Sequence, residues 1–217
     1  MSTESAVPGI MERLRTETRP QHDKAEESGF GVAVMSKTLP RSAYCIHIAA
    51  HRAILEAIET AHAVNESPRI QAVWHEGLKK VPLLDNDLRA LGCDSEVMPA
   101  MTCEAVDRFC GMVERRAAEE PESLPGVLYV LEGSTMGGSI MKMKLAESLG
   151  LSEGNGLDYY SVYGNEVRKH FMDFKERMGR AYDGSCYEDM IVEAGRETFD
   201  LIGNVFRSIP LELEQPA

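Results

Sequence analysis

Apolar residues recur every three or four positions through most of the chain, which is the spacing of one face of an α-helix. Alternating runs of β-branched residues, which would indicate strands, are rare. The segments that carry the helical pattern or a helix-forming composition are 10–28, 41–65, 68–79, 99–118, 122–149, 165–182 and 185–208. We therefore predict an all-α fold, built as a single compact multi-helix domain with six to eight helices and no sheet.

Proline and glycine mark the ends of these segments. The expected breaks are Leu39-Pro40, Val81-Pro82, Leu91-Gly92, Glu120-Pro121, Gly154-Asn155-Gly156 and Asp183-Gly184. Pro20 falls within the first segment, where it removes a backbone donor. It either interrupts one helix or lies in the first turn of a new one, capped by Thr18 with Gln21 completing a capping box.

Composition is that of a soluble globular protein, with 217 residues, 43% hydrophobic and 27% charged. The net charge of −12 disfavours binding to nucleic acid or to an anionic membrane surface. No stretch approaches the roughly 18 apolar residues of a membrane span, and the first residues do not resemble a secretory signal. The five cysteines form no C-x-x-C pair, so we expect reduced thiols and a cytoplasmic location.

The six histidines do not form a recognisable metal motif. A di-iron site of the ferritin type needs two Glu-x-x-His pairs, and the chain has one, Glu59 with His62. We interpret that pair as part of a solvated helix face. His47 and His51 lie one turn apart and could form half a metal site, but no carboxylate or cysteine follows at a matching spacing.

Two segments carry more specific chemistry. The first contains His22, one turn after Thr18 and one turn before Glu26, on a stripe expected to face inward. Such a histidine is either a hydrogen-bonded core residue or a ligand. The second contains three glycines, Gly133, Gly137 and Gly138, each costing about 1 kcal/mol in a helix. Tight helix packing, close approach of a ligand to the backbone, or a simple loop would each explain them.

Together the two segments resemble the heme oxygenase family, in its bacterial, biliverdin-producing branch. The pattern L-R-x-x-T-R-x-x-H-x-x-x-E matches Leu14, Arg15, Thr18, Arg19, His22 and Glu26. The pattern E-G-S-x-x-G-G matches Glu132, Gly133, Ser134, Gly137 and Gly138. Fainter matches are Tyr163-Gly164 and Thr198-Phe199. The resemblance implies a heme oxygenase-like helical domain over 10–209, with a flexible N-terminal tail at 1–9 and a C-terminal tail at 210–217.

The resemblance also implies a site. Heme, both substrate and cofactor, would lie between the first helix and the glycine-containing helix, with His22 as the axial ligand of the iron. Gly133, Ser134, Gly137 and Gly138 would border the face where O2 reacts. The implied cofactor-binding residues are Arg15, Thr18, Arg19, Glu26, Lys175 and Phe199, with Arg15, Arg19 and Lys175 pairing with the propionates, helped by Arg168 or Lys169. The implied products are biliverdin, CO and ferrous iron, with electrons from an external donor such as a ferredoxin or a reductase.

One departure from the family pattern bears on activity. Animal members carry Asp where this chain has Ser134, and that Asp organises the waters that deliver protons. A hydroxyl holds a water less strongly than a carboxylate does. A non-catalytic heme-binding or heme-trafficking protein of the same fold is therefore the alternative, and an unrelated helical scaffold is a third. Basic docking of an acidic donor would rest on a local group of cations, Arg13, Arg15, Arg19, Lys24 and Lys175.

Overall fold

A computed structural model describes residues 8–93 and 98–212. The α-helices are α1 (Ile10–Glu17), α2 (Arg19–Glu26), α3 (Gly29–Met35), α4 (Arg41–Ala63), α5 (Pro68–Val73), α6 (Val81–Leu91), α7 (Ala100–Glu119), α8 (Leu124–Leu149), α9 (Val167–Tyr182) and α10 (Glu188–Ser208). Short 3-10 turns occur at Glu76–Leu78, Pro121–Ser123, Tyr159–Ser161 and Gly164–Glu166. No strand occurs in the described part of the chain, which confirms the all-α prediction. Most of the two expected tails, 1–9 and 210–217, lies outside the described residues.

The first predicted segment is two helices, α1 and α2, that meet at Thr18. Thr18 has φ −100° and ψ 0°, and Pro20 lies in the first turn of α2. Pro20 therefore starts a new helix and does not interrupt a single one. The predicted capping box is wrong, because the Thr18 hydroxyl donates to the Leu14 carbonyl at 2.7 Å instead of capping α2. The helix axis therefore changes at Thr18, one turn before His22.

Two helices were not predicted, and one was predicted too long. Helix α3 begins at Gly29 and is capped by Ser28, whose hydroxyl accepts from the Gly31 amide at 3.3 Å. Helix α6 begins at the Val81-Pro82 pair that the sequence analysis treated only as a break, because proline is accommodated in a first turn. The predicted helix 68–79 ends at Val73.

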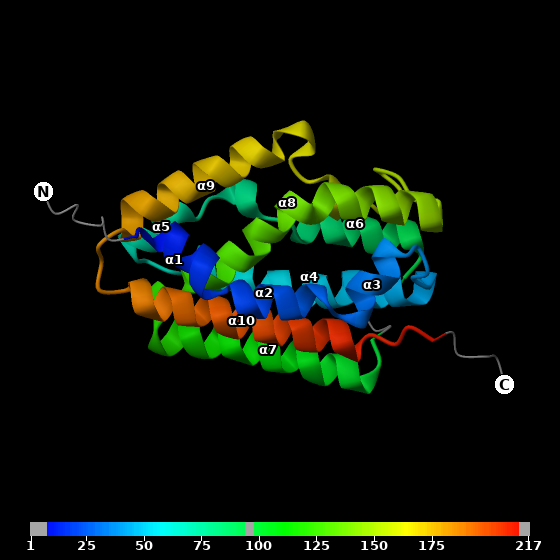
Figure 1. Ribbon diagram of the computed structural model, residues 1–217, viewed down its shortest axis with the longest axis horizontal. Coiled ribbons are helices and arrows are strands. Elements are labelled where there is room, and N and C mark those ends of the chain that lie inside the picture. The colour runs from blue at the N-terminus through cyan, green and yellow to red at the C-terminus, as the bar shows by residue number, and fades with distance from the viewer. Residues whose placement is uncertain (1–7, 94–97, 213–217) are drawn as a thin grey trace, which may run out of the picture.

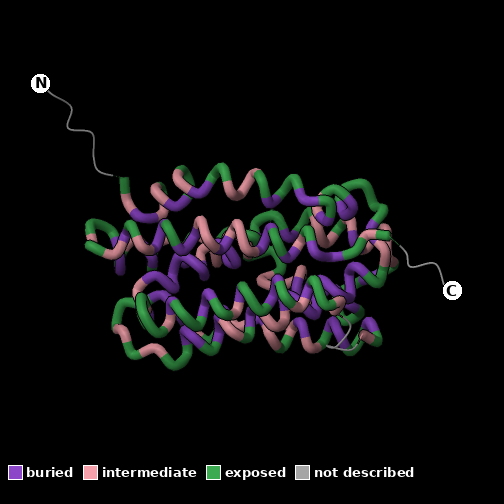
Figure 2. The backbone as a smooth tube through the Cα atoms, turned by 90° about the horizontal axis from the view of Figure 1, so that it is seen from below, coloured by how far each residue is buried: buried purple, intermediate pink, exposed green. Residues whose placement is uncertain are grey.

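Buried residues gather on the inward sides of the long helices, while exposed positions line the outside (Figure 2). Helix α10 packs against α7 and α8, and α4 packs against α6 and α7. Helix α2 lies on α10, whereas α2 and α8 have little direct contact with each other. In Figure 1, α8 changes direction along its length, in keeping with the glycines near its middle. None of the described helices is long and apolar enough to cross a membrane.

Helices α8 and α10 approach each other closely near the start of α8. A Cβ atom added at Gly126 would lie 2.0 Å from the Ile191 carbonyl oxygen of α10, so only glycine fits there. This contact fixes the start of α8 on α10.

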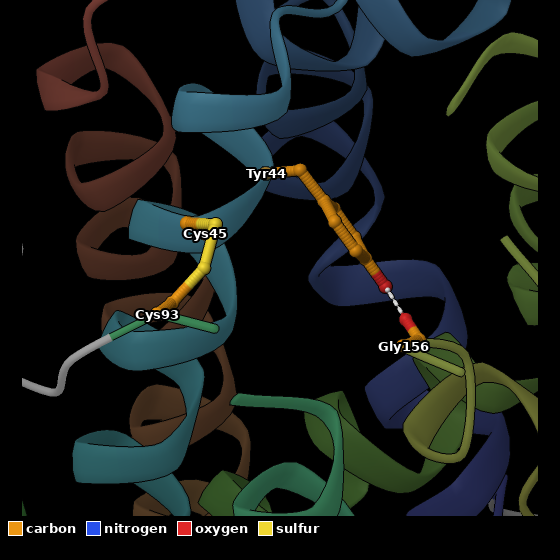
Figure 3. The surroundings of a disulfide bond; sticks show 4 residues. All are labelled: Tyr44, Cys45, Cys93 and Gly156. Atoms are coloured by element: carbon orange, nitrogen blue, oxygen red, sulfur yellow. Dashed lines mark hydrogen bonds between the residues drawn. A yellow bond between two sulfur atoms is a disulfide. The ribbon is translucent and has the colours of Figure 1, made fainter. Parts of the chain in front are cut away.

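A disulfide joins Cys45 of α4 to Cys93, which follows α6 (Figure 3). The expectation of reduced thiols is therefore wrong for this pair, while Cys103, Cys110 and Cys186 are free. The two cysteines are 48 positions apart in sequence, and the packing of α4 on α6 brings their Cα atoms to 6.0 Å. The neighbouring Tyr44 hydroxyl donates to the Gly156 carbonyl at 2.7 Å, which ties the loop after α8 to α4.

Candidate functional site

His22 is not a buried core residue. Its side chain is 37% exposed, whereas Leu14, Thr18 and Ala25 of the same stripe are buried. The Phe199 ring of α10 meets the imidazole edge-on, with the ring centroids 5.5 Å apart. The bend at Thr18 thus leaves the imidazole packed on one side and accessible on another.

Two carboxylates flank the imidazole. Nδ1 lies 3.2 Å from the Asp23 Oδ1 atom, and Nε2 lies 3.5 Å from the Glu26 Oε1 atom. Hydrogen bonds from Arg19 and then from His22 lower the pKa of Asp23, so this carboxylate stays ionised. Sequence reasoning singled out Glu26 and missed Asp23. A carboxylate directly after a candidate histidine ligand is the signal that would have shown it.

The glycines at the centre of α8 do not serve helix packing. A Cβ atom added at Gly137 would meet nothing within 4 Å, and one at Gly133 would only touch the Phe171 ring at 4.0 Å. Gly138 is buried and faces Tyr160, at 3.9 Å. The segment is helical throughout, so it is not a loop. These observations argue against tight helix packing and against a loop, and the approach of a ligand to the backbone stays a prediction.

Large apolar side chains accompany these open glycines. Met136 is 43% exposed and Ile140 is 48% exposed, on the same helix as Gly137. An exposed apolar surface next to bare backbone is suited to a flat apolar ligand. Ser134, also exposed, donates its hydroxyl to the Leu131 carbonyl at 2.7 Å.

A buried ion pair holds the glycine segment in place. Glu132, which directly precedes Gly133, is 2% exposed and pairs with Lys80, which is 1% exposed. The Tyr163 hydroxyl donates to the same carboxylate at 3.1 Å. Tyr163 has a left-handed φ of 65°, and its ring stacks on His170 with centroids 4.1 Å apart. Sequence reasoning missed Lys80, because its partner lies 52 positions away.

The Glu59–His62 pair does not lie on a solvated face, so that interpretation was wrong. Glu59 is 8% exposed and His62 is 1% exposed. Glu59 accepts from the backbone amides of Lys80 and Val81, at 2.6 and 3.0 Å. The His62 Nδ1–H donates to the Ile58 carbonyl at 2.8 Å. Glu59 thus stabilises the junction of α4 with α6, His62 is bonded within α4, and neither has the partners of a di-iron site.

Two of the three cations first expected to pair with the propionates are already ion-paired. Arg15 lies 2.6 Å from Glu12, and Arg19 lies 2.7 Å from Asp23. Among the described residues, Lys175 has no ion-pair partner, and it lines a cavity of about 420 Å³ between α1 and α9. That cavity includes neither His22 nor any other residue of α2.

The expected basic docking group is largely neutralised. Arg13 pairs with Glu17, Glu188 and Asp189, and Lys24 lies 3.4 Å from Asp200. Helix α10 supplies three of these carboxylates. A charge-guided face for an acidic donor therefore has little support at this position.

The family model for heme oxygenase matches residues 9–208. The chain belongs to the heme oxygenase family. No curated protein sequence matches the chain. Its fold is similar to that of heme oxygenase from Leptospira interrogans, with a TM-score of 0.83 and 21% identity over 92% of this chain and 99% of that one. It is also similar to heme oxygenase-2 from Synechocystis sp. PCC 6803, whose structure contains heme and NO, with a TM-score of 0.85 and 20% identity over 93% and 85%.

The residues of this heme oxygenase-family chain are suited to heme. An accessible imidazole on α2 is a good ligand for heme iron. The exposed apolar side chains of α8 and the open backbone at Gly137 beside them can face a planar apolar macrocycle. Phe199, one of the implied heme-binding residues, lies beside His22, whereas Thr18, another of them, is buried under α10 and supports the bend.

Proposed function

We propose that this chain binds heme through His22 and degrades it to biliverdin, CO and ferrous iron. The observation that supports this most directly is that the fold contains both an accessible, carboxylate-flanked imidazole on α2 and a glycine segment on α8 that has no packing role. Membership of the heme oxygenase family supplies the chemistry that such a site would perform.

Each residue of the site has a defined task in this proposal. The His22 Nε2 atom would hold the iron, which fixes the macrocycle above α2. Its Nδ1–H would donate to the Asp23 carboxylate, which keeps the ring oriented and increases the electron density on Nε2. Phe199 limits rotation of the imidazole from the α10 side. Lys175 would bind a propionate, and Arg15 would join it by exchanging its partner Glu12.

The α8 side of the site controls space and protons. When bound, heme supplies the iron that activates dioxygen and the carbon skeleton that is cleaved. The bare backbone at Gly133 and Gly137 leaves room on that face for O2, and the Ser134 hydroxyl can hold a water there. The exposed apolar side chains of Met136 and Ile140 would exclude bulk water from this side once heme is bound.

Electrons would come from a separate ferredoxin or reductase in the cytoplasm. Because the cations around α1 and α2 are mostly ion-paired, we expect the rate of reduction to depend only weakly on salt.

The alternative, a non-catalytic heme carrier, is favoured by one observation: Ser134 donates its proton to the Leu131 carbonyl, which leaves only its lone pairs for water. One experiment separates the two functions. Hemin is added to the purified protein with a reductant under air, and the Soret band is followed. We expect the band to decay as the spectrum of biliverdin appears. A stable Soret band in the reduced, aerated complex would instead show a carrier.

A further inference from the structure

Tyr163 has a backbone conformation that large residues rarely adopt. Its φ is 65° and its ψ is −5°, in the left-handed region, and the next residue, Gly164, also has a positive φ, of 52°. A glycine takes up such a conformation without strain, whereas a bulky side chain is an outlier there. Strained residues persist where the surrounding structure holds them, and they are concentrated at functional sites. The contacts of the Tyr163 side chain therefore have to hold this conformation.

The Tyr163 side chain joins two helices. Its ring stacks on His170, in the first turn of α9, with the centroids 4.1 Å apart and the ring planes at 11° to each other. Its hydroxyl donates to the Glu132 Oε2 atom of α8 at 3.1 Å. Burial, followed by the negative charge of Glu132, raises the pKa of Tyr163, so the hydroxyl keeps its proton and remains a donor. Tyr163 is thus a direct tie between the start of α9 and the middle of α8.

The buried carboxylate of Glu132 has one partner at each oxygen. Oε1 pairs with the Lys80 ammonium, and Oε2 accepts from Tyr163. The Lys80 ammonium also donates to the Leu78 carbonyl at 3.1 Å, so the ion pair ties Glu132 to the chain that precedes α6. The Tyr163 hydroxyl adds the tie to α9. A buried carboxylate that is bonded at both oxygens is held in one position, because losing either bond inside the protein is unfavourable.

Gly133, the next residue, depends on this anchor. A Cβ atom added at Gly133 would come no closer than 4.0 Å to Phe171 of α9, so no tight contact with that helix holds the glycine directly. Glycines also allow a helix to bend. The position of the Gly133 backbone relative to α9 is therefore set at Glu132, one residue earlier.

We propose that Tyr163 is a positioning residue that, through Glu132, fixes the Gly133 backbone relative to α9 and so selects the meso carbon at which heme is opened. This inference rests on the proposed function, in which that backbone leaves room for O2. The meso carbons of heme are chemically similar, so a wall selects one of them only if it keeps its place. A displacement of about 1 Å within a site can cost about 10²-fold in rate. Tyr163 acts through Glu132 and is not itself a catalytic residue.

The test uses three tyrosine variants. Tyr163→Phe removes the hydroxyl and keeps the ring on His170, while Tyr163→Gly relaxes the backbone and removes both contacts. Tyr182→Phe is the matched control, because the Tyr182 hydroxyl also donates to a carboxylate, that of Glu122 at 2.8 Å, but from the last residue of α9. Hydrogen exchange at residues 133–138 and the free energy of unfolding are measured without heme. The dissociation constant of hemin, the rate of biliverdin formation and the isomers of biliverdin are measured with it.

In Tyr163→Phe we expect faster hydrogen exchange at residues 133–138 and a mixture of biliverdin isomers where the wild type forms mainly one. Its rate should fall by about tenfold. Hemin should bind within about twofold of the wild type, because the hydroxyl is not among the groups proposed to bind heme. Tyr163→Gly should show larger changes in the same direction, although its backbone is relaxed. Tyr182→Phe should keep the wild-type rate and isomers even where it lowers the free energy of unfolding. His170→Ala should shift the isomers and keep the axial ligation.

Three results would overturn the positioning role. One is a Tyr163→Phe protein with the wild-type rate and isomers. Another is the same change of isomers in Tyr182→Phe, which would show a general effect of destabilisation. The third is unchanged hydrogen exchange at residues 133–138 in Tyr163→Phe without heme. Failure of the proposed function gives a different pattern, in which the wild type itself forms no biliverdin while hydrogen exchange is still faster in Tyr163→Phe.

Discussion

The imidazole of His22 and the ring of Phe199 meet edge-on at 5.5 Å, although the two residues lie at opposite ends of the chain. Edge-on aromatic contacts of this kind contribute about 0.5–1.5 kcal/mol beyond burial. The contact holds the imidazole of α2 against α10, so it limits the orientations that an axial ligand can take.

His22→Ala should therefore abolish axial histidine ligation and biliverdin formation, and Phe199→Leu should weaken heme binding by less than about tenfold while keeping the ligation. Absorption and resonance Raman spectra of the hemin complexes measure both. His170→Ala is the control, because its side chain is also 37% exposed but lies on α9. Wild-type spectra and turnover in His22→Ala would refute the assignment of the ligand.

The open backbone at Gly137 predicts separate effects on folding and on activity. Gly137→Ala places a methyl group in empty space within a helix, so it should raise the free energy of unfolding by about 0.5–1 kcal/mol. The same methyl group would intrude on the face where O2 reacts, so biliverdin yield per folded molecule should fall. Gly126→Ala is the contrasting variant, because its methyl group collides with the Ile191 carbonyl and should destabilise the fold severely. A destabilised Gly137→Ala with normal yield would mean that Gly137 serves packing after all.

The Lys80–Glu132 ion pair predicts non-additive energetics. Lys80→Met or Glu132→Leu alone leaves one charge buried without its partner, which typically costs about 3–5 kcal/mol. The double variant should recover most of that loss. Urea denaturation of the four proteins measures the coupling energy. If the losses of the two single variants simply add, the pair does not hold the glycine segment as described.

The buried histidines predict a loss of stability in acid. Burial lowers the pKa of His51 and His62 from the ordinary 6.5 to about 4. Between these values the unfolded chain binds more protons than the folded one, so the free energy of unfolding falls as the pH falls. Asp87 acts in the opposite sense, because burial raises its pKa to about 6, but His47 reinforces the two histidines.

Urea denaturation at pH 7.5 and 5.0 tests this expectation. The contribution of a single histidine to the difference is about 2 kcal/mol. His62→Gln keeps a donor for the Ile58 carbonyl but cannot titrate, so it should reduce the difference by roughly that amount. An unchanged pH dependence in His62→Gln would contradict the lowered pKa of this histidine.

The Cys45–Cys93 disulfide predicts sensitivity to reduction. A crosslink between residues 48 positions apart stabilises a fold by up to about 4 kcal/mol, through its effect on the unfolded chain. Wild-type protein should lose part of its free energy of unfolding when a reductant is added, whereas Cys45→Ala/Cys93→Ala should not respond. Titration of the denatured, unreduced protein should find three free thiols, and five would show that the bond is absent.

The sequence by itself determined the helical class, most of the long helices and the two motifs that resemble heme oxygenases. These features depend on residues a few positions apart, such as the three- and four-residue spacing of apolar side chains and the unusual glycines within α8. The spacing of apolar residues could not show whether Val81-Pro82 ends a helix or begins one, because proline is found in both places. In the structure, α6 begins there. It also could not detect α3, which is only two turns long.

The tertiary structure decided which of the motif residues remain available for chemistry. His22 turned out accessible beside Phe199, and Gly137 faces open space, while Thr18 is buried. Lys80 with Glu132, and Cys45 with Cys93, are joined across 52 and 48 positions. Such pairs leave no local pattern, because their geometry exists only once separate helices have packed. The free energy that brings them together comes from the burial of the whole core and not from the residues themselves.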